Sequence, residues 1–246
     1  MIRNGKIKLC AKAVSAALAL LALLFAVFPA CSIKTASETA PRRPTIRGTE
    51  IIDDEPSRHV IRHSLVIISK HVDENGCSLL YPYVCNNGMT LLNINIRAAF
   101  TEFADECEAA EGEISYVTEF NRFGLLSIMM TYSVSGRTIC FDTANFDADT
   151  GKRVRLSDCF GSTSADYRAK LAEIVLRTAD SEGYTLIAEQ PPVNDDTMFV
   201  FTFGGLYLVY PEYELFTHEA GAPRIKIGCR AMTNYTSPDG LMNRLR

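Results

Sequence analysis

Three of the four histidines of this chain, His59, His63 and His71, lie close together in the sequence and raise the question of a metal site. Histidines at i and i+4 can share a metal ion when they lie on one face of a helix. The segment that holds them, HVIRHSLVIISKHV, is apolar and rich in β-branched residues, and it predicts a strand. Along a strand, four residues span about 13 Å, which is too far for one shared ion. We therefore predict no metal site here.

The sequence offers no catalytic centre either. His218 stands beside Glu219 without a serine or cysteine in a nucleophile motif, and GxSxG, HExxH, Walker A and SxxK patterns are absent from the sequence. The run Asp147–Gly151 (DADTG) resembles the opening of a calcium loop, but position twelve is Asp158, where that loop needs a bidentate glutamate. We predict a turn at this run, no catalytic residue and no cofactor.

Tyrosines and glutamates near the C-terminal end are the candidates for ligand binding. Tyrosine supplies rigid, amphipathic contact area, and neighbouring carboxylates would add attraction for a cationic ligand. The candidates are Tyr207, Tyr210, Tyr213, Glu212, Glu214 and Glu219. On a strand, either Tyr207 or Tyr210 must face inward, so core packing is the alternative for one of them. For the three glutamates the alternative is a role in solubility.

Six cysteines follow the N-terminal region, and an even number in an exported protein suggests disulfides. They are Cys77, Cys85, Cys107, Cys140, Cys159 and Cys229. Cys77 and Cys85 form the best local pair because both flank one expected loop. Cys107 lies on an apolar helical stripe, where a free buried thiol is ordinary. A core of this size does not require disulfides, so a reduced domain is the alternative.

Composition and charge narrow the class of protein. Of the 246 residues, 47% are hydrophobic and 22% are charged, which is typical of a globular chain. Four of the 25 basic residues and none of the 29 acidic ones fall within residues 1–30, so residues 31–246 carry 21 bases, 29 acids and a net charge of −8. Nucleic acids and anionic membranes repel such a body, whereas a cationic protein attracts it.

The N-terminal 30 residues read as a signal peptide or a membrane anchor. A basic start precedes an uncharged run of 18 residues, Ala13–Ala30, which ends at Cys31. Pro29, Ala30 and Cys31 resemble a bacterial lipobox, which predicts lipidation at Cys31. A single uncleaved span and ordinary cleavage with secretion are the alternatives. Each of them places the rest of the chain outside the cytoplasm.

The remaining chain divides into a flexible tether at residues 31–57, one domain at 58–236 and a C-terminal tail at 237–246. Helices are expected along the apolar stripe from Leu92 to Cys107 and after a cap at Ser164, with Asp166 near the positive end of the helix dipole. Strands are expected at 59–72, 114–120, 125–134, 138–146, 153–156, 198–203, 206–210 and 224–228. Consecutive hairpins with two helices predict an α+β fold, a largely antiparallel sheet with two main helices packed on it.

Two long stretches resemble a known family. They are YVTEFNRFGLLSIMMTYSVSGRTICFDTANFDADTGKRVRLSDCF at residues 116–160 and FGGLYLVYPEYELFTHEAGAPRIKI at residues 203–227. Both resemble the extracytoplasmic domain found in the anti-sigma-V factor ectodomain and in the N-terminal part of a peptidoglycan deacetylase. Upstream, LLYPYVCNNGMTLLNINIRAAF at residues 79–100 resembles that family's Tyr-Pro turn and first helix. The similarity therefore covers about residues 58–235.

The resemblance implies an extracellular module that in the anti-sigma members binds lysozyme. The sequence departs from the family at Ser135–Thr138, where many members carry a histidine, and only twelve residues precede Ala13, too few to bind a sigma factor. The catalytic domain of the deacetylase has no counterpart in this sequence. We therefore expect a tethered, non-catalytic binding or sensor-like module of the bacterial envelope whose ligand is a cationic protein such as lysozyme, or cell-wall glycan. The alternative is an enzyme or enzyme accessory domain acting on cell-wall glycan.

Overall fold

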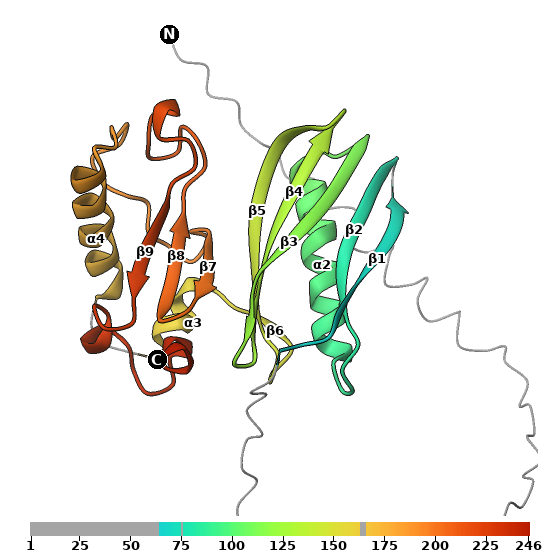
Figure 1. The fold of residues 1–246 in the computed structure, drawn as a ribbon, viewed down its shortest axis with the longest axis horizontal. Helices are drawn as coiled ribbons and strands as arrows, with labels where there is room; N and C mark the ends of the chain where they lie inside the picture. The colour runs from blue at the N-terminus through green and yellow to red at the C-terminus, as the bar shows by residue number, and fades with distance from the viewer. Residues whose placement is uncertain (1–63, 75, 163–165) are drawn as a thin grey trace, which may run out of the picture. The chain divides into compact units, whose positions relative to one another are not determined.

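A computed structural model describes residues 64–74, 76–162 and 166–246, all of which belong to one compact unit (Figure 1). The apolar run at 13–30, Cys31, the tether, His59, His63 and Ser164 lie outside the described residues. Among the helices that are described, none has the length and hydropathy to cross a membrane.

Six strands form a large sheet in the order β1-β2-β3-β4-β5-β6. They are β1 (Ile67–Glu74), β2 (Cys77–Val84), β3 (Gly112–Arg122), β4 (Leu125–Val134), β5 (Arg137–Asp147) and β6 (Lys152–Arg153). Neighbouring strands are antiparallel except β2 and β3, which pair in parallel over a short stretch. The helix α2 (Thr90–Glu106) connects these two strands, because a parallel pair needs a long crossover.

One face of the large sheet packs against α2. The buried residues of the helix lie on the predicted stripe and are Leu92, Ile96, Ala99, Phe100 and Phe103. They share a core with β-strand residues such as Ile128, Ala144 and Phe146. The period of the sequence therefore predicted both this helix and the face that it buries.

A second, three-stranded sheet and two further helices make the other half of the unit. The sheet has the order β7 (Phe199–Thr202), β8 (Gly205–Val209) and β9 (Arg224–Gly228), and the helices are α3 (Leu156–Phe160) and α4 (Tyr167–Glu182). Leu171 and Val175 of α4 share a core with β-strand residues such as Leu208 and Ile227. The α+β fold with two main helices is confirmed, although its strands are divided between two sheets.

The start of α4 is capped by Asp166, whose carboxylate accepts a hydrogen bond from the backbone N–H of Ala169 (3.1 Å). This contact satisfies one of the free N–H groups of the first turn.

The helix α3 differs from the expectation, because the sequence predicts a short strand at residues 153–156. In the structure β6 ends at Arg153, and the helix begins at Leu156.

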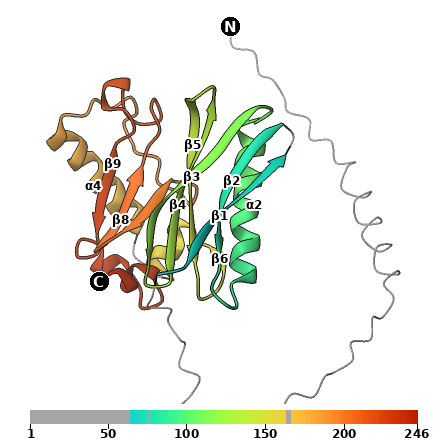
Figure 2. The same cartoon turned by 45° about the vertical axis from the view of Figure 1, so that its right-hand side comes forward.

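The small sheet meets the other face of the large one through its edge strand β7 (Figure 2). Hydroxyl and amide side chains of the large sheet bond the free edge of β7. The Phe201 N–H donates to Ser127 Oγ (2.8 Å), and the Phe199 N–H donates to Thr143 Oγ1 (3.2 Å). The Asn145 amide donates to the Phe199 carbonyl (2.7 Å). The edge of β7 is therefore satisfied by side chains instead of by another strand.

Residues 237–246, which the sequence separated as a tail, belong to the domain. The 3-10 helix η3 (Leu241–Leu245) buries Met242 and Leu245 in the core of the small sheet. Arg244 also pairs with Asp147 of β5 (2.8 Å). The C-terminal segment therefore connects the two halves of the unit.

The expected disulfide between Cys77 and Cys85 is wrong. Both thiols are free, and the disulfide joins Cys107, at the end of α2, to Cys140 of β5. Cys77 opens β2 and Cys85 directly follows it, so eight strand rises of about 3.3 Å separate them instead of the expected loop. Two cysteines bridge only when their Cα atoms are within about 7 Å.

Candidate functional site

The six residues predicted for ligand binding do not form one surface. Tyr210 is completely buried in the core, where burial raises the pKa of its phenol well above the ordinary range. Tyr207 is half-buried on β8, opposite Lys226 of β9. Tyr213 is 65% exposed. Tyr210 is therefore a core residue and not a candidate for ligand binding, which is the alternative that the sequence left open for Tyr207 or Tyr210.

A small exposed cluster remains at this end. The rings of Tyr213 and His218 stack with centroids 5.8 Å apart, and His218 Nδ1 lies 2.9 Å from Glu212 Oε2. Glu214 and Glu219 are also exposed, and partial burial raises the pKa of the Glu214 carboxyl. Each of these groups already has a local partner or faces solvent. The cluster is a polar surface feature, and its residues do not line either of the two cavities described below.

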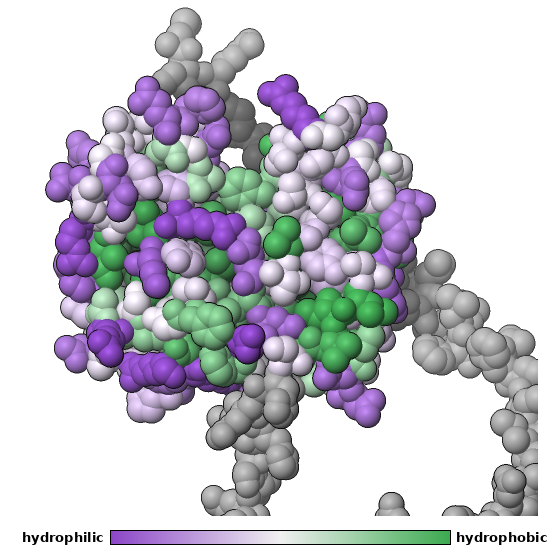
Figure 3. All heavy atoms as spheres, viewed as in Figure 1, coloured by the Kyte–Doolittle hydropathy of each residue, from purple (hydrophilic) through white to green (hydrophobic). Residues whose placement is uncertain are grey.

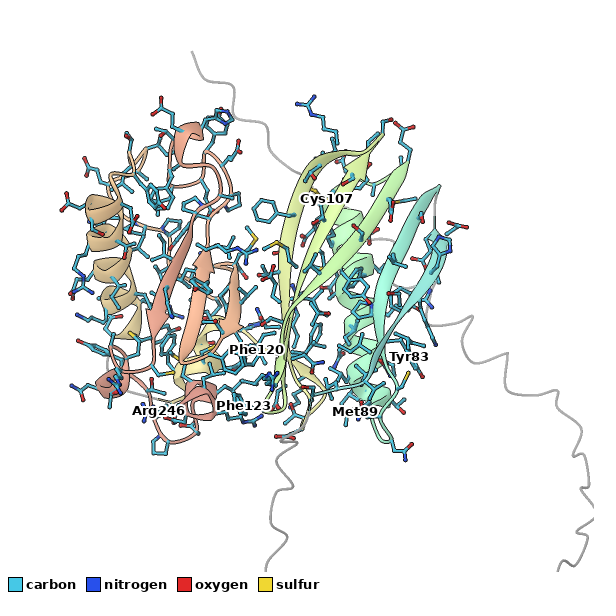
Figure 4. The ribbon with its side chains drawn as sticks, in the orientation of Figure 1. Tyr83, Met89, Cys107, Phe120, Phe123 and Arg246 are labelled. Atoms are coloured by element: carbon cyan, nitrogen blue, oxygen red, sulfur yellow. A yellow bond between two sulfur atoms is a disulfide. The ribbon has the colours of Figure 1, made fainter. Side chains whose placement is uncertain are left out.

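One cavity, of about 270 Å³, lies between α2 and the first strands near Glu74 and Thr101. A larger one, of about 910 Å³, lies along the edge of β5. We call it the β5 groove. Four segments line it: Glu102, Phe103 and Glu106 of α2 with Cys107 directly after the helix; Ile139–Thr143 and Asn145 of β5; Arg153–Arg155; and the segment from Asp195 to Phe199, the first residue of β7. Figure 4 labels Cys107, which marks the end of α2 at this groove. Five acidic residues and two arginines line the groove, and a third arginine, Arg168, pairs with Asp195 (3.2 Å), so the acidic residues remain in excess.

Asp142 is the most constrained acid of the groove. One carboxylate oxygen accepts a hydrogen bond from the backbone N–H of Thr143 (2.6 Å), and the other lies 3.8 Å from Arg153 Nη2. Burial is the main cause that raises the pKa of Asp142, with Glu106 adding to the rise, while the Thr143 N–H and Arg153 oppose it. Arg153 is shared, because it also donates to Glu102 (2.8 Å).

The aspartates at the predicted turn have partners within the protein. Asp147 accepts hydrogen bonds from the Asp149 N–H and the Thr150 hydroxyl, and Arg244 pairs with both Asp147 and Asp149. This arrangement agrees with the predicted turn.

Among the described residues, no three histidine, cysteine, aspartate or glutamate side chains lie close enough together to hold a metal ion. His71 of the proposed histidine spacing bonds to Ser78 on the neighbouring strand (2.7 Å).

Apolar side chains are also exposed outside the groove. Figure 3 shows a hydrophobic patch on the viewed face, toward its lower right. Among the most exposed apolar residues are Val66 and Ile68 at the start of β1, Val117 of β3, and Phe203 in the turn after β7. Phe203 packs edge-on against Phe120 and Phe123. Exposed apolar residues are normal on folded proteins, and these give no site by themselves.

Sequence analysis missed the β5 groove. Its walls come from segments that are up to about a hundred residues apart, and no residue spacing within one segment signals them. The only local signal was the alternation along β5, which places Asp142 among otherwise apolar positions on the α2 face.

Comparisons with known proteins identify the fold. No protein-family model matches the sequence, and no curated protein matches it significantly. Several solved structures are similar, including the following two. A member of the DUF3298 family from Bacteroides fragilis NCTC 9343 has a TM-score of 0.53 and 13% identity, over 75% of this chain and 98% of that one. A DUF3298 family protein from Pseudomonas aeruginosa PAO1 has a TM-score of 0.51 and 14% identity, over 73% of this chain and 97% of that one. The chain thus shares the fold of DUF3298 domains.

Proposed function

We propose that this chain is a non-catalytic binding module outside the cytoplasm, held at the bacterial cell membrane by its N-terminal region, and that its ligand is a cationic protein such as lysozyme. The observation that carries the proposal is the β5 groove, where five carboxylates outnumber two arginines. Attraction between such a groove and a basic partner raises the association rate and fixes the orientation of the partner. The net charge of −8 on residues 31–246 adds long-range attraction.

The proposed location has independent support from the Cys107–Cys140 disulfide. Disulfides persist in oxidising compartments and are rare in the cytosol. The lipobox-like residues before Cys31 support the same location. The finer resemblance to the anti-sigma-V ectodomain, which binds lysozyme, supports the choice of partner, and we propose that this chain is related to that domain.

Cell-wall glycan is the second candidate ligand, and glycan hydrolysis is the alternative activity. One observation favours hydrolysis: Asp142 has a raised pKa and lies near Glu102 and Glu106, and glycosidases use pairs of carboxyl groups of which one is kept protonated. Release of reducing ends from purified peptidoglycan by the full chain, and its loss in Asp142→Asn, would establish that alternative.

The proposal is tested with two charge-matched variants of the full chain and lysozyme as the probe. The first combines Glu106→Gln, Asp142→Asn and Asp196→Asn in the β5 groove. The second combines Glu212→Gln, Glu214→Gln and Glu219→Gln at the tyrosine-rich end. Both remove three negative charges, so they change long-range attraction equally and differ only in the local surface.

We expect the groove variant to slow association and weaken binding at low salt by at least about tenfold, since it loses several local charge contacts. The second variant should lose only the modest effect of net charge. A larger loss in the second variant would place the site at the tyrosine-rich end. Failure of the unmodified chain to bind lysozyme in 50 mM salt would overturn the proposed partner.

A further inference from the structure

The outer edge of β5 is open along most of its length. On the side away from β4, β6 pairs only with Phe146 and Asp147, and the next contact is the hydrogen bond from Val154 N–H to the Asn145 carbonyl (2.7 Å). Hydrogen-bonding direction alternates along a strand. Phe141 and Thr143 therefore present their backbone groups to the same outer edge as Asn145. In the described ranges, no strand pairs with the outer edge of β5 before Phe146.

The β5 groove lies at this open edge. Five consecutive residues of β5, Ile139–Thr143, line the groove. The groove therefore runs along the strand. Residues on the α2 side of the edge are Glu102, Glu106 and Asp142, and those on the β7 side are Asp195 and Asp196. A strand placed along β5, in line with β6, would direct alternate side chains toward these two groups of carboxylates.

An edge strand with free N–H and C=O groups is a template for pairing, and proteins often protect such edges with charged side chains. Asp142 protects the edge of β5 in this way, because its carboxylate accepts a hydrogen bond from the outward-facing N–H of Thr143 (2.6 Å). A carbonyl of an incoming strand can replace the carboxylate at that N–H. The released carboxylate would then be available for a cationic side chain of the same incoming strand.

We propose that the β5 groove binds an extended basic peptide segment of the partner protein, which adds to the large sheet as a strand beside β5. The inference rests on the proposed function, because it specifies how a cationic protein is recognised. Backbone hydrogen bonds to Phe141 and Thr143 supply the pairing, and the carboxylates on both sides of the edge select arginine or lysine at alternate positions. The charge excess of the groove, five acids to two arginines, excludes acidic segments.

The test uses the full chain in detergent micelles and a blocked octapeptide that alternates arginine and valine. Two further versions of the peptide carry N-methyl groups on alternate backbone amides, one version for each alternation. In an added strand, one alternate set of amides faces β5 and the other faces away. We expect one version to lose at least about tenfold in affinity and the other to bind nearly as the parent peptide does.

Three further measurements complete the test. Asp142→Asn should weaken the parent peptide at least about tenfold, because the cation loses its charged partner. A glutamate–valine octapeptide should not bind. The outward-facing amides of Phe141 and Thr143 should gain protection from hydrogen exchange when the parent peptide is added.

Several outcomes would overturn strand addition. Equal affinities of the two N-methylated peptides would show that the peptide backbone does not form hydrogen bonds with β5. Strong protection of the outward-facing Phe141 amide in the chain without peptide would show that a segment outside the described residues already occupies the edge. If lysozyme binds through the groove while the octapeptide fails, strand addition is wrong and the proposed function stands. If neither binds, both proposals fall.

Discussion

Asn145 is almost completely buried, yet its amide group has a partner on each side. Its carbonyl oxygen accepts from Ser127 Oγ (2.6 Å), and its NH₂ group donates to the Phe199 carbonyl (2.7 Å). Ser127 in turn accepts from the Phe201 N–H. A buried polar group is stabilising only while every member of such a network is satisfied. The contact between the two sheets therefore depends on single polar side chains as well as on apolar packing.

We predict that Asn145→Ala lowers the free energy of unfolding by about 2–4 kcal/mol, because the Phe199 carbonyl loses its partner at a buried position. Ser127 also loses an acceptor and a small cavity is created. Urea unfolding followed by circular dichroism measures the change. Ser133→Ala, a half-buried position of β4, is the matched control and should change stability by less than about 0.5 kcal/mol. Similar losses in both variants would show that the network contributes nothing specific.

At the scale of elements, the Cys107–Cys140 disulfide joins the end of α2 to β5 and lines the β5 groove. Thirty-three residues separate the two cysteines, and this segment contains the whole hairpin of β3 and β4. The bond therefore restricts a long loop in the unfolded chain. It also holds one wall of the groove beside the open edge of the sheet.

Replacing both cysteines, Cys107→Ser with Cys140→Ser, should lower the free energy of unfolding by about 3–4 kcal/mol, as expected from the entropy of closing a loop of this length. Chemical denaturation under oxidising conditions gives the value. A thiol reductant should produce a similar loss in the unmodified chain and none in the double variant. Cys85→Ser, at an exposed free thiol, is the control. Unchanged stability in the double variant would mean that the two thiols are not bonded in solution.

At the scale of the whole molecule, the folded domain and the proposed membrane anchor belong to different parts of the chain. The described residues from 64 to the C-terminus, apart from residues 75 and 163–165, hold two apolar cores, one under α2 and one under α4. The C-terminal 3-10 helix completes the second core and links it to β5 through Arg244. The proposed anchor lies outside the described residues and is tested on its own.

The anchor is tested in cells with an alkyne analogue of palmitate. If Cys31 is lipidated, we expect the analogue to label the unmodified chain and not Cys31→Ser, which should accumulate as the uncleaved precursor. Cys10→Ser, within the basic N-terminal start, is the control and should be labelled normally. Equal labelling of all three chains would contradict lipidation at Cys31. A full-length band beginning at Met1 in every case would favour the uncleaved span.

The sequence by itself determined the elements whose residues repeat with a clear period. The stripe from Leu92 to Phe103 defined α2 and its buried face, and alternation defined β4 with the bounds that the structure has, Leu125–Val134. It failed at β2, where Pro82 lacks a backbone N–H and argues against a strand. The wrong disulfide follows from the same residues, because without β2 the sequence places Cys77 and Cys85 on the two sides of one loop.

Only the tertiary structure decided which distant residues meet. The Cys107–Cys140 bond, the side chains that satisfy the edge of β7, and the β5 groove all join segments that are far apart in the chain. Periodicity reports which face of one element is buried, but not which other element covers that face. The core position of Tyr210 was a choice that alternation left open, and the packing of the small sheet against α4 settled it. The net negative charge can be counted from the sequence. The gathering of acidic residues in one groove depends instead on how α2, β5 and the segment before β7 pack together.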